Sequence, residues 1–204
     1  EISACLVGSE MCIRDRIKAQ MIIKDPGSSI THFIGMLCAI AGLFPLILKA
    51  ASYGTTVSVV SMTVFMVSMI LLYAASTTYH TFDISSNVNI VLKRLDHCMI
   101  PVLIAGSYTP VCLIVLHNIY GYVMFGIVWG IAILAIAFKL LWVTCPKWIS
   151  SVLYIVMGWT CVMALPQIYS ALAGAAFFWL LAGGIIYTIG GVIYACLLYT
   201  SPSP

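Results

Sequence analysis

Six long apolar stretches follow one another along this chain, and they constrain its fold more than any other feature of the sequence. Each is close to the roughly 20 residues that an α-helix needs to cross the hydrocarbon core of a bilayer. The connections between them are short, so no separate soluble domain fits between two stretches. We expect the spans at approximately residues 30–48, 57–79, 95–116, 120–142, 149–167 and 171–195.

The composition supports a membrane location. Hydrophobic residues make up 63% of the chain and charged residues only 7%, whereas a soluble domain carries roughly 25% charged residues. Such a chain cannot cover a water-facing surface, so we predict an all-α, polytopic transmembrane helix bundle. The basic residues are spread among the connections and form no stripe, so we expect no nucleic-acid partner.

The basic residues predict how the bundle is oriented. One side carries six of them, in the polar lead-in, the second-to-third connection and the region between the fourth and fifth spans: Lys18, Lys24, Lys93, Arg94, Lys139 and Lys147. The opposite side has Lys49 alone. Because cytoplasmic connections carry an excess of Lys and Arg, we predict a cytoplasmic N-terminus and a multi-pass protein of the cell (plasma) membrane.

The two ends look foreign to this pattern. Residues 1–16 are neither amphipathic at helical period nor a signal peptide, and residues 196–204 follow an apolar run with an abrupt Ser/Pro tail. Both resemble translated sequencing adaptor, and such segments are excluded from fold reasoning. We therefore expect the native transmembrane domain at residues 17–195, and a natural chain that continues beyond Ala195.

Polar residues gather in one stretch, residues 76–110, between very apolar segments. Ser76 and His80 are four residues apart, which places them on one face of the second predicted helix. Asp96 begins the third span on the same side of the membrane. Ionisable groups at membrane depth cost roughly 2.5–3.5 kcal/mol each on insertion scales, so each needs a reason. We predict that Ser76, His80 and Asp96 converge at the cytoplasmic end of the bundle.

Each of these residues also has a plain structural interpretation. Asp96 could cap the third helix or pair with Arg94, His80 could be an interfacial residue, and Ser76 could bond its own backbone four residues back. One histidine also cannot hold a catalytic zinc, which normally takes three protein ligands.

Three other histidines could bear on such a site. His32 opens the first span at a depth similar to that of His80. His97 adjoins Asp96, but consecutive helical residues point about 100° apart, so both would not face one ion. His117 is on the opposite side of the membrane and does not belong to this cluster.

Three runs carry a resemblance to a known family. They are THFIGM (31–36), STTYH (76–80) and LDHCMIPVLIAGSYTP (95–110). Over roughly residues 18–195 the chain resembles the hemolysin III family, the bacterial branch of the progestin and adipoQ receptors. The resemblance implies a seven-helix bundle that binds zinc through His80 and two histidines of an HxxxH pattern on the seventh helix. This sequence has no such pattern, so the resemblance implies truncation before the last helix.

The resemblance also implies a function. The wider group resembles alkaline ceramidases, which suggests a zinc-dependent hydrolase that cleaves an amide or ester bond of a membrane lipid. In such a site zinc would activate a water molecule, with Asp96 orienting that water and Ser76 donating to the carbonyl oxygen. Two alternatives remain open: a cytolytic or pore-forming membrane protein, and a non-catalytic receptor or regulator of membrane homeostasis. No residue identifies the lipid.

Overall fold

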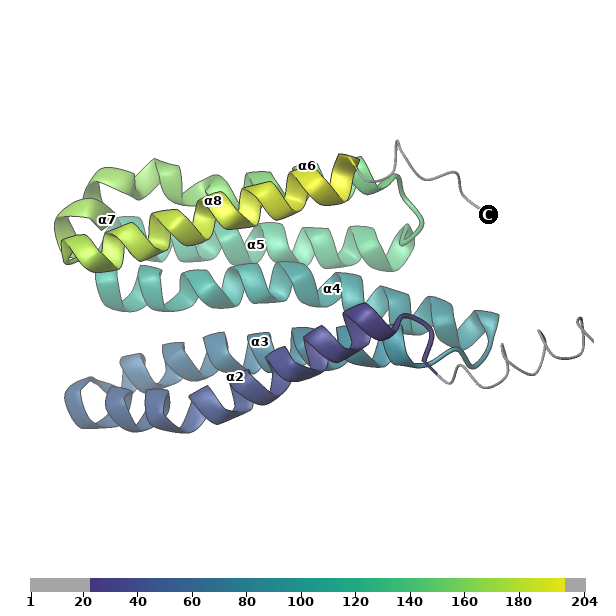
Figure 1. The fold of residues 1–204 in the computed structure, drawn as a ribbon. Helices are drawn as coiled ribbons and strands as arrows, with labels where there is room; N and C mark the ends of the chain where they lie inside the picture. The colour runs from purple at the N-terminus through teal and green to yellow at the C-terminus, as the bar shows by residue number, and fades with distance from the viewer. Residues whose placement is uncertain (1–22, 197–204) are drawn as a thin grey trace, which may run out of the picture.

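The computed structural model describes residues 23–196, and that part of the chain is built of helices joined by short turns (Figure 1). Six of its helical segments are long and apolar enough to cross a membrane, which confirms the predicted polytopic bundle. The helices are α2 (Pro26–Tyr53), α3 (Thr56–Thr81), α4 (Ser86–Pro110), α5 (Ile119–Leu141), α6 (Lys147–Gly158), α7 (Leu165–Ala171) and α8 (Gly174–Cys196).

The third helix begins earlier than the apolar pattern predicts. We expected a span from about residue 95, but α4 starts at Ser86. The side chain of Ser85 accepts a hydrogen bond from the backbone N–H of Val88 and so caps the first turn. The polar connection before the third span is therefore mostly helix, because a cap and not hydrophobicity decides where a helix begins.

Two spans contain a stretch that is not α-helical, and a proline adjoins each of them. Pro110 ends α4 and is followed by the π-helical turn Val111–Leu116. Between α6 and α7 the chain forms the 3-10 segment Trp159–Ala164, and Pro166 lies in the first turn of α7. These irregular turns agree with the expected effect of proline, which removes a backbone donor and crowds the preceding turn. Pro101, for which we also expected a kink or an unwound turn, lies inside the continuous helix α4.

The helices are arranged in an order that follows the chain. Helix α2 packs on α3, α3 on α4 and α4 on α5, while α8 packs mainly on α6 (Figure 1). The α2–α3 pair lies on one side of α4, and α5, α6 and α8 lie on the other. Helix α4 is thus the central element against which both halves are built.

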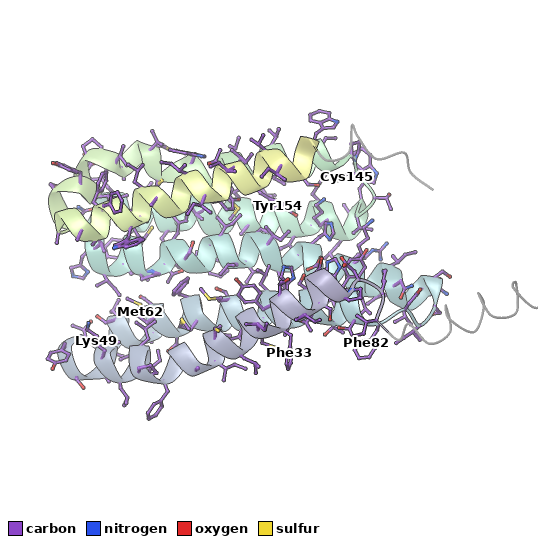
Figure 2. The ribbon with its side chains drawn as sticks, viewed as in Figure 1. Phe33, Lys49, Met62, Phe82, Cys145 and Tyr154 are labelled. Atoms are coloured by element: carbon purple, nitrogen blue, oxygen red, sulfur yellow. The ribbon has the colours of Figure 1, made fainter. Side chains whose placement is uncertain are left out.

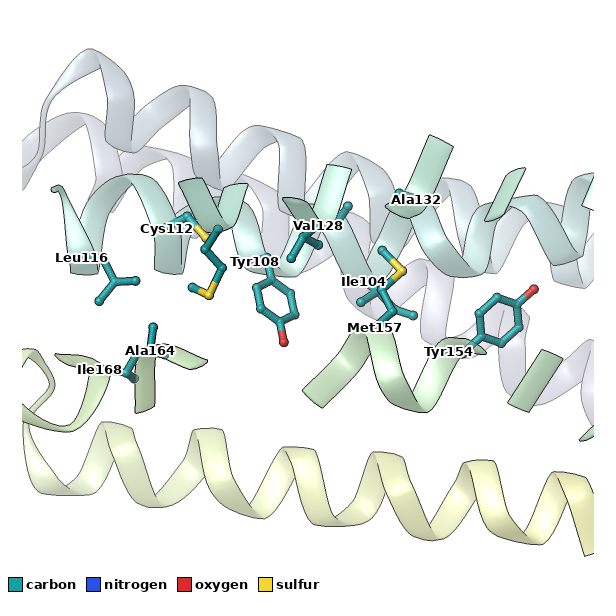
Figure 3. Packing of buried hydrophobic residues seen from close by; sticks show 12 residues of the cluster. Ile104, Tyr108, Cys112, Leu116, Val128, Ala132, Tyr154, Met157, Ala164 and Ile168 are labelled. Atoms are coloured by element: carbon teal, nitrogen blue, oxygen red, sulfur yellow. The ribbon is translucent and has the colours of Figure 1, made fainter. Parts of the chain in front are cut away.

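The buried apolar core lies where α4 meets α5, α6 and α7 (Figure 3). Ala105, Val128 and Met157 have no exposed surface there, and each comes from a different helix. Around them, Ile104, Cys112 and Ile168 complete the contact seen in the close view. Many other large apolar side chains face outward, as expected where the surroundings are lipid.

Tyr108 joins α4 to the irregular part of the fifth span. Its hydroxyl donates to the carbonyl oxygen of Gly158 at 2.5 Å and accepts from the backbone N–H of Cys161 at 2.9 Å. Both groups lie where α6 gives way to the 3-10 segment. Unpaired backbone groups are costly in hydrocarbon. The buried Tyr108 hydroxyl therefore stabilises this interruption of the helix, because it pairs with one backbone carbonyl and one backbone N–H.

Residues 1–16, and all of 196–204 except Cys196, lie outside the described residues. The predicted cytoplasmic connections lie at one end of the bundle, shown by Phe82 and Cys145 in Figure 2, and Lys49 lies at the other. The cytoplasmic assignment itself stays a prediction.

A close approach of α3 and α4 depends on Gly106. A Cβ atom there would lie 2.2 Å from Oγ and 2.8 Å from Cβ of Ser68. We expect Gly106→Ala to lower the free energy of unfolding by about 1–3 kcal/mol, because the added methyl group overpacks the contact. Gly126→Ala is the matched control, since a Cβ atom at that position of α5 would have no neighbour within 4 Å. Thermal unfolding in detergent would measure both, and equal melting temperatures would contradict the prediction.

Candidate functional site

A cavity of about 900 Å³ lies at the end of the bundle where Figure 2 labels Phe82 and Cys145. Ser76, His80 and Asp96 all line it. Sequence reasoning therefore placed these three side chains around one space. Catalysis by Ser76 and Asp96 and metal binding by His80 stay predictions.

His32 of α2 is the direct partner of Ser76. Its Nδ1 lies 2.7 Å from Oγ of Ser76 on α3. Ser76 is almost completely buried, with 4% of its surface exposed. This contact links α2 to α3 inside the cavity. His32, which the sequence suggested as a further histidine of the site, therefore contacts Ser76.

His80 contacts a residue that sequence reasoning did not select. Its Nδ1 lies 3.2 Å from Oδ2 of Asp25, and its ring lies 5.9 Å from that of His32, centroid to centroid. The chain before α2 also runs along the end of α3, where Lys24 and Asp25 donate their backbone N–H groups to the carbonyl oxygens of Thr81 and His80. His80 is thereby fixed by main chain and side chain together.

Asp25 also starts helix α2. Its carboxylate accepts hydrogen bonds from the hydroxyl and the backbone N–H of Ser28, so it is the N-cap. The hydrogen bond from the Ser28 hydroxyl, with help from nearby His80, holds the pKa of the Asp25 carboxyl below its usual value. The sequence signal was present as an Asp before Pro-Gly-Ser, which is a typical helix start.

Asp96 is buried about three turns into α4 and has His97 as its ion-pair neighbour, with Oδ2 and Nδ1 3.6 Å apart. The same nitrogen of His97 lies 2.9 Å from the carbonyl oxygen of Lys93. His97 also lines the cavity. The expectation that His97 and Asp96 do not both face one ion stays a prediction.

On the far wall of the cavity is a polar corner that sequence reasoning missed. It consists of Lys139 from the end of α5, Cys145 from the following turn, and Ser150 from α6. Lys139 was used only to count charges, although an ionisable residue inside a predicted span is itself a signal of function.

Two other polar residues stay away from the cavity. Asp83 is exposed beyond the end of α3 and accepts from the side-chain amide of Asn89 at 2.6 Å. His117 lies between the π-helical turn and α5, with a left-handed backbone (φ 38°). Both positions agree with the interpretation from sequence.

The described residues do not fit a zinc site by themselves. Between residues 23 and 196, no three His, Cys, Asp or Glu side chains lie close enough to hold one ion, and a catalytic zinc takes three protein ligands. His80 has a histidine neighbour, but Nδ1 of His80 faces Asp25 and Nδ1 of His32 faces Ser76. We therefore assign no step of chemistry to a metal.

Comparison with known proteins places the chain beside one group. Residues 20–201 match the family model described as Haemolysin-III related. The chain is 41% identical over 173 residues to a protein of Bacillus subtilis (strain 168) named Hemolysin-3 homolog, covering 85% of this chain and 81% of that protein. It is 39% identical over 175 residues to Hemolysin-3 of Bacillus cereus, covering 86% and 80%. No solved structure matches.

The cap at Asp25 predicts a pH dependence of stability. Because the pKa of Asp25 is lowered by folding, its ionised form stabilises the protein at a pH above the unfolded value of about 3.9, and this contribution is lost as the pH falls through the lower folded value. Asp25→Asn keeps an oxygen that can cap the helix but removes the charge. Solvent screens this partly exposed carboxylate, so we expect the variant to be less stable by only about 0.3–1 kcal/mol at pH 7. We expect this difference to shrink as the pH falls through the lowered folded pKa.

Thermal unfolding of the wild type and of Asp25→Asn in detergent, at pH 7 and at a series of acidic pH values, would measure this difference. Asp83→Asn removes an exposed carboxylate near the same end and is the control. A stability difference between wild type and Asp25→Asn that does not change with pH would show that the charge of Asp25 contributes nothing.

Proposed function

This chain belongs to the Haemolysin-III related family, and from that premise we propose that it hydrolyses an amide or ester bond of a membrane lipid. The observation that carries the proposal is the shared cavity of Ser76, His80 and Asp96 at one end of a membrane-spanning bundle. A lipid whose headgroup lies at that end of the bilayer would bring its polar linkages to the depth of these side chains. The proposed location is the cell (plasma) membrane, with the cavity on the cytoplasmic side.

Asp96 would be the general base. The residue is 9% exposed and lines the cavity, so water that enters with the lipid could donate a hydrogen bond to its carboxylate. A carboxylate in that position can accept the proton of the water as the water attacks the carbonyl carbon. His97, 3.6 Å away, would hold the carboxylate in place.

Ser76 would donate to the carbonyl oxygen of the lipid while negative charge develops on it. The hydrogen bond with His32 decides whether the hydroxyl hydrogen is available. If Nδ1 of His32 carries the proton, it donates to the Ser76 oxygen, and the hydroxyl hydrogen is free to point into the cavity. His32 is then a positioning residue that acts through Ser76.

Zinc remains part of the proposal as an expectation from the family resemblance. His80 would be one ligand, and a catalytic ion would take two more, which the described residues do not bring to it. The roles of Asp96 and Ser76 given above are stated for the side chains alone.

Membrane lysis is the second candidate, and the name Hemolysin-3 of the Bacillus cereus relative favours it. A conducting pore would need polar side chains along the whole membrane depth. The polar cavity lies at one end, and the core between α4, α5 and α6 is apolar (Figure 3). Hydrolysis therefore ranks above lysis. A receptor or regulator without turnover is the third candidate.

Turnover in lipid nanodiscs tests the proposal. We expect the wild-type protein to release a fatty acid from at least one lipid of an amide- and ester-linked panel, and Asp96→Asn and Ser76→Ala to lower kcat by about 100-fold or more. Asp83→Asn is the matched control, because Asp83 is an exposed carboxylate beyond the end of α3. Metal content of the wild type and of His80→Ala, measured by mass spectrometry, tests the zinc expectation.

Three outcomes would overturn parts of this picture. Undiminished turnover in Asp96→Asn would remove Asp96 from the chemistry. Vesicle leakage that persists in a His80→Ala/Asp96→Asn double variant would favour lysis. A bound metal without product from any lipid of the panel would favour the regulator.

A further inference from the structure

Lys139 is the most deeply buried charged side chain among the described residues, with 1% of its surface exposed. It belongs to the last turn of α5. Burying an ammonium group costs several kcal/mol unless a partner compensates it. A lysine in this position therefore needs a reason beyond packing.

The neighbours of Lys139 within the described part of the chain carry no formal negative charge. Its Nζ donates to Oγ of Ser150 and, at 3.1 Å, to Sγ of Cys145. No described Asp or Glu forms an ion pair with it, since the carboxylates in such pairs are Asp25 and Asp96, each with a histidine. An ammonium group has three N–H donors, so one donor is left after these two hydrogen bonds. The neutral rings of Phe138 and Tyr154 also lie nearby, each with its centroid 5.9 Å from Nζ.

The cavity gives a ligand access to this third N–H donor of Lys139. Lys139, Cys145 and Ser150 all line it, and so does Lys93 from α4. Asp96 is the one acidic side chain among the lining residues, and it has His97 beside it. The two lysines therefore give the cavity an excess of positive charge close to an apolar, lipid-facing bundle.

From this arrangement we infer that the corner of Lys139, Cys145 and Ser150 binds the phosphate group of an anionic ligand that enters the cavity. A phosphate group offers several acceptor oxygens, and lysine binds it as a point charge. One oxygen would accept from the third N–H of Lys139 and a second from the Ser150 hydroxyl, while Lys93 of α4 adds positive charge to the same cavity. The inference rests on the proposed function in taking the ligand to be a lipid of this cavity, but it requires no turnover.

Binding by detergent-solubilised wild-type protein tests the inference. Native mass spectrometry would compare phosphatidic acid with diacylglycerol of the same acyl chains, which lacks only the phosphate. We expect phosphatidic acid to bind at least about tenfold more tightly, because its phosphate would compensate the buried charge of Lys139. Equal affinities for the two lipids would overturn the inference without any variant.

A lysine variant locates the site. Lys139→Met removes the charge and keeps the length, and replacing a buried charge by an apolar group is often neutral or stabilising. We expect it to lose the preference for phosphatidic acid, while Lys49→Met at the other end of the bundle keeps that preference. Lys139→Arg restores the charge and should restore the preference if the variant melts within a few degrees of the wild type. A preference retained in Lys139→Met would place the phosphate elsewhere and overturn the inference.

Inorganic phosphate separates the two sources of the group. If millimolar phosphate competes with phosphatidic acid, the corner binds free phosphate as well as a headgroup. If phosphatidic acid alone binds, the acyl chains are required and the ligand is a lipid. Either result supports the phosphate site. A wild type that prefers phosphatidic acid but hydrolyses no lipid would leave this inference intact and reject the proposed hydrolase.

Discussion

A polar group inside an apolar bundle needs a partner or a route to water, and this constraint explains where the irregular features of the molecule lie. Helical hydrogen bonding satisfies most of the backbone. Where it fails, between α6 and α7, the hydroxyl of Tyr108 pairs with one carbonyl and one N–H group. The buried ionisable side chains of Asp96 and Lys139 both line one cavity at the end of the bundle.

Because of the same constraint, most polar side chains of the cavity occur in contacting pairs. His32 satisfies Ser76, Asp25 satisfies His80, and His97 lies beside Asp96. Each pair joins residues from different places in the chain or from successive positions of α4, so the walls hold one another in place. Lys139 differs because its described partners are neutral, and this difference separates the corner it occupies from the rest of the site.

Most of the fold could be predicted because hydrophobicity and length alone select membrane spans. The common depth of Ser76, His80 and Asp96 followed from their places along those spans. The contacts did not follow, because the bond between His32 and Ser76 depends on how α2 is rotated against α3, and no sequence spacing fixes that rotation. The start of α4 was misplaced for a related reason, since the cap at Ser85 extends the helix into a polar segment. The position of Lys139 inside a predicted span also indicated a functional residue, but we used Lys139 only to predict the orientation of the bundle.

The two backbone hydrogen bonds from Lys24 and Asp25 to the end of α3 have a mechanical consequence. The last carbonyl groups of a helix usually bond water or a capping residue of the same helix, but here residues that precede the first span take that place. The entry to α2 and the residue His80 are therefore joined directly by main-chain hydrogen bonds. A displacement of this entry would reach the wall of the cavity through the backbone of His80, whose side chain lines it.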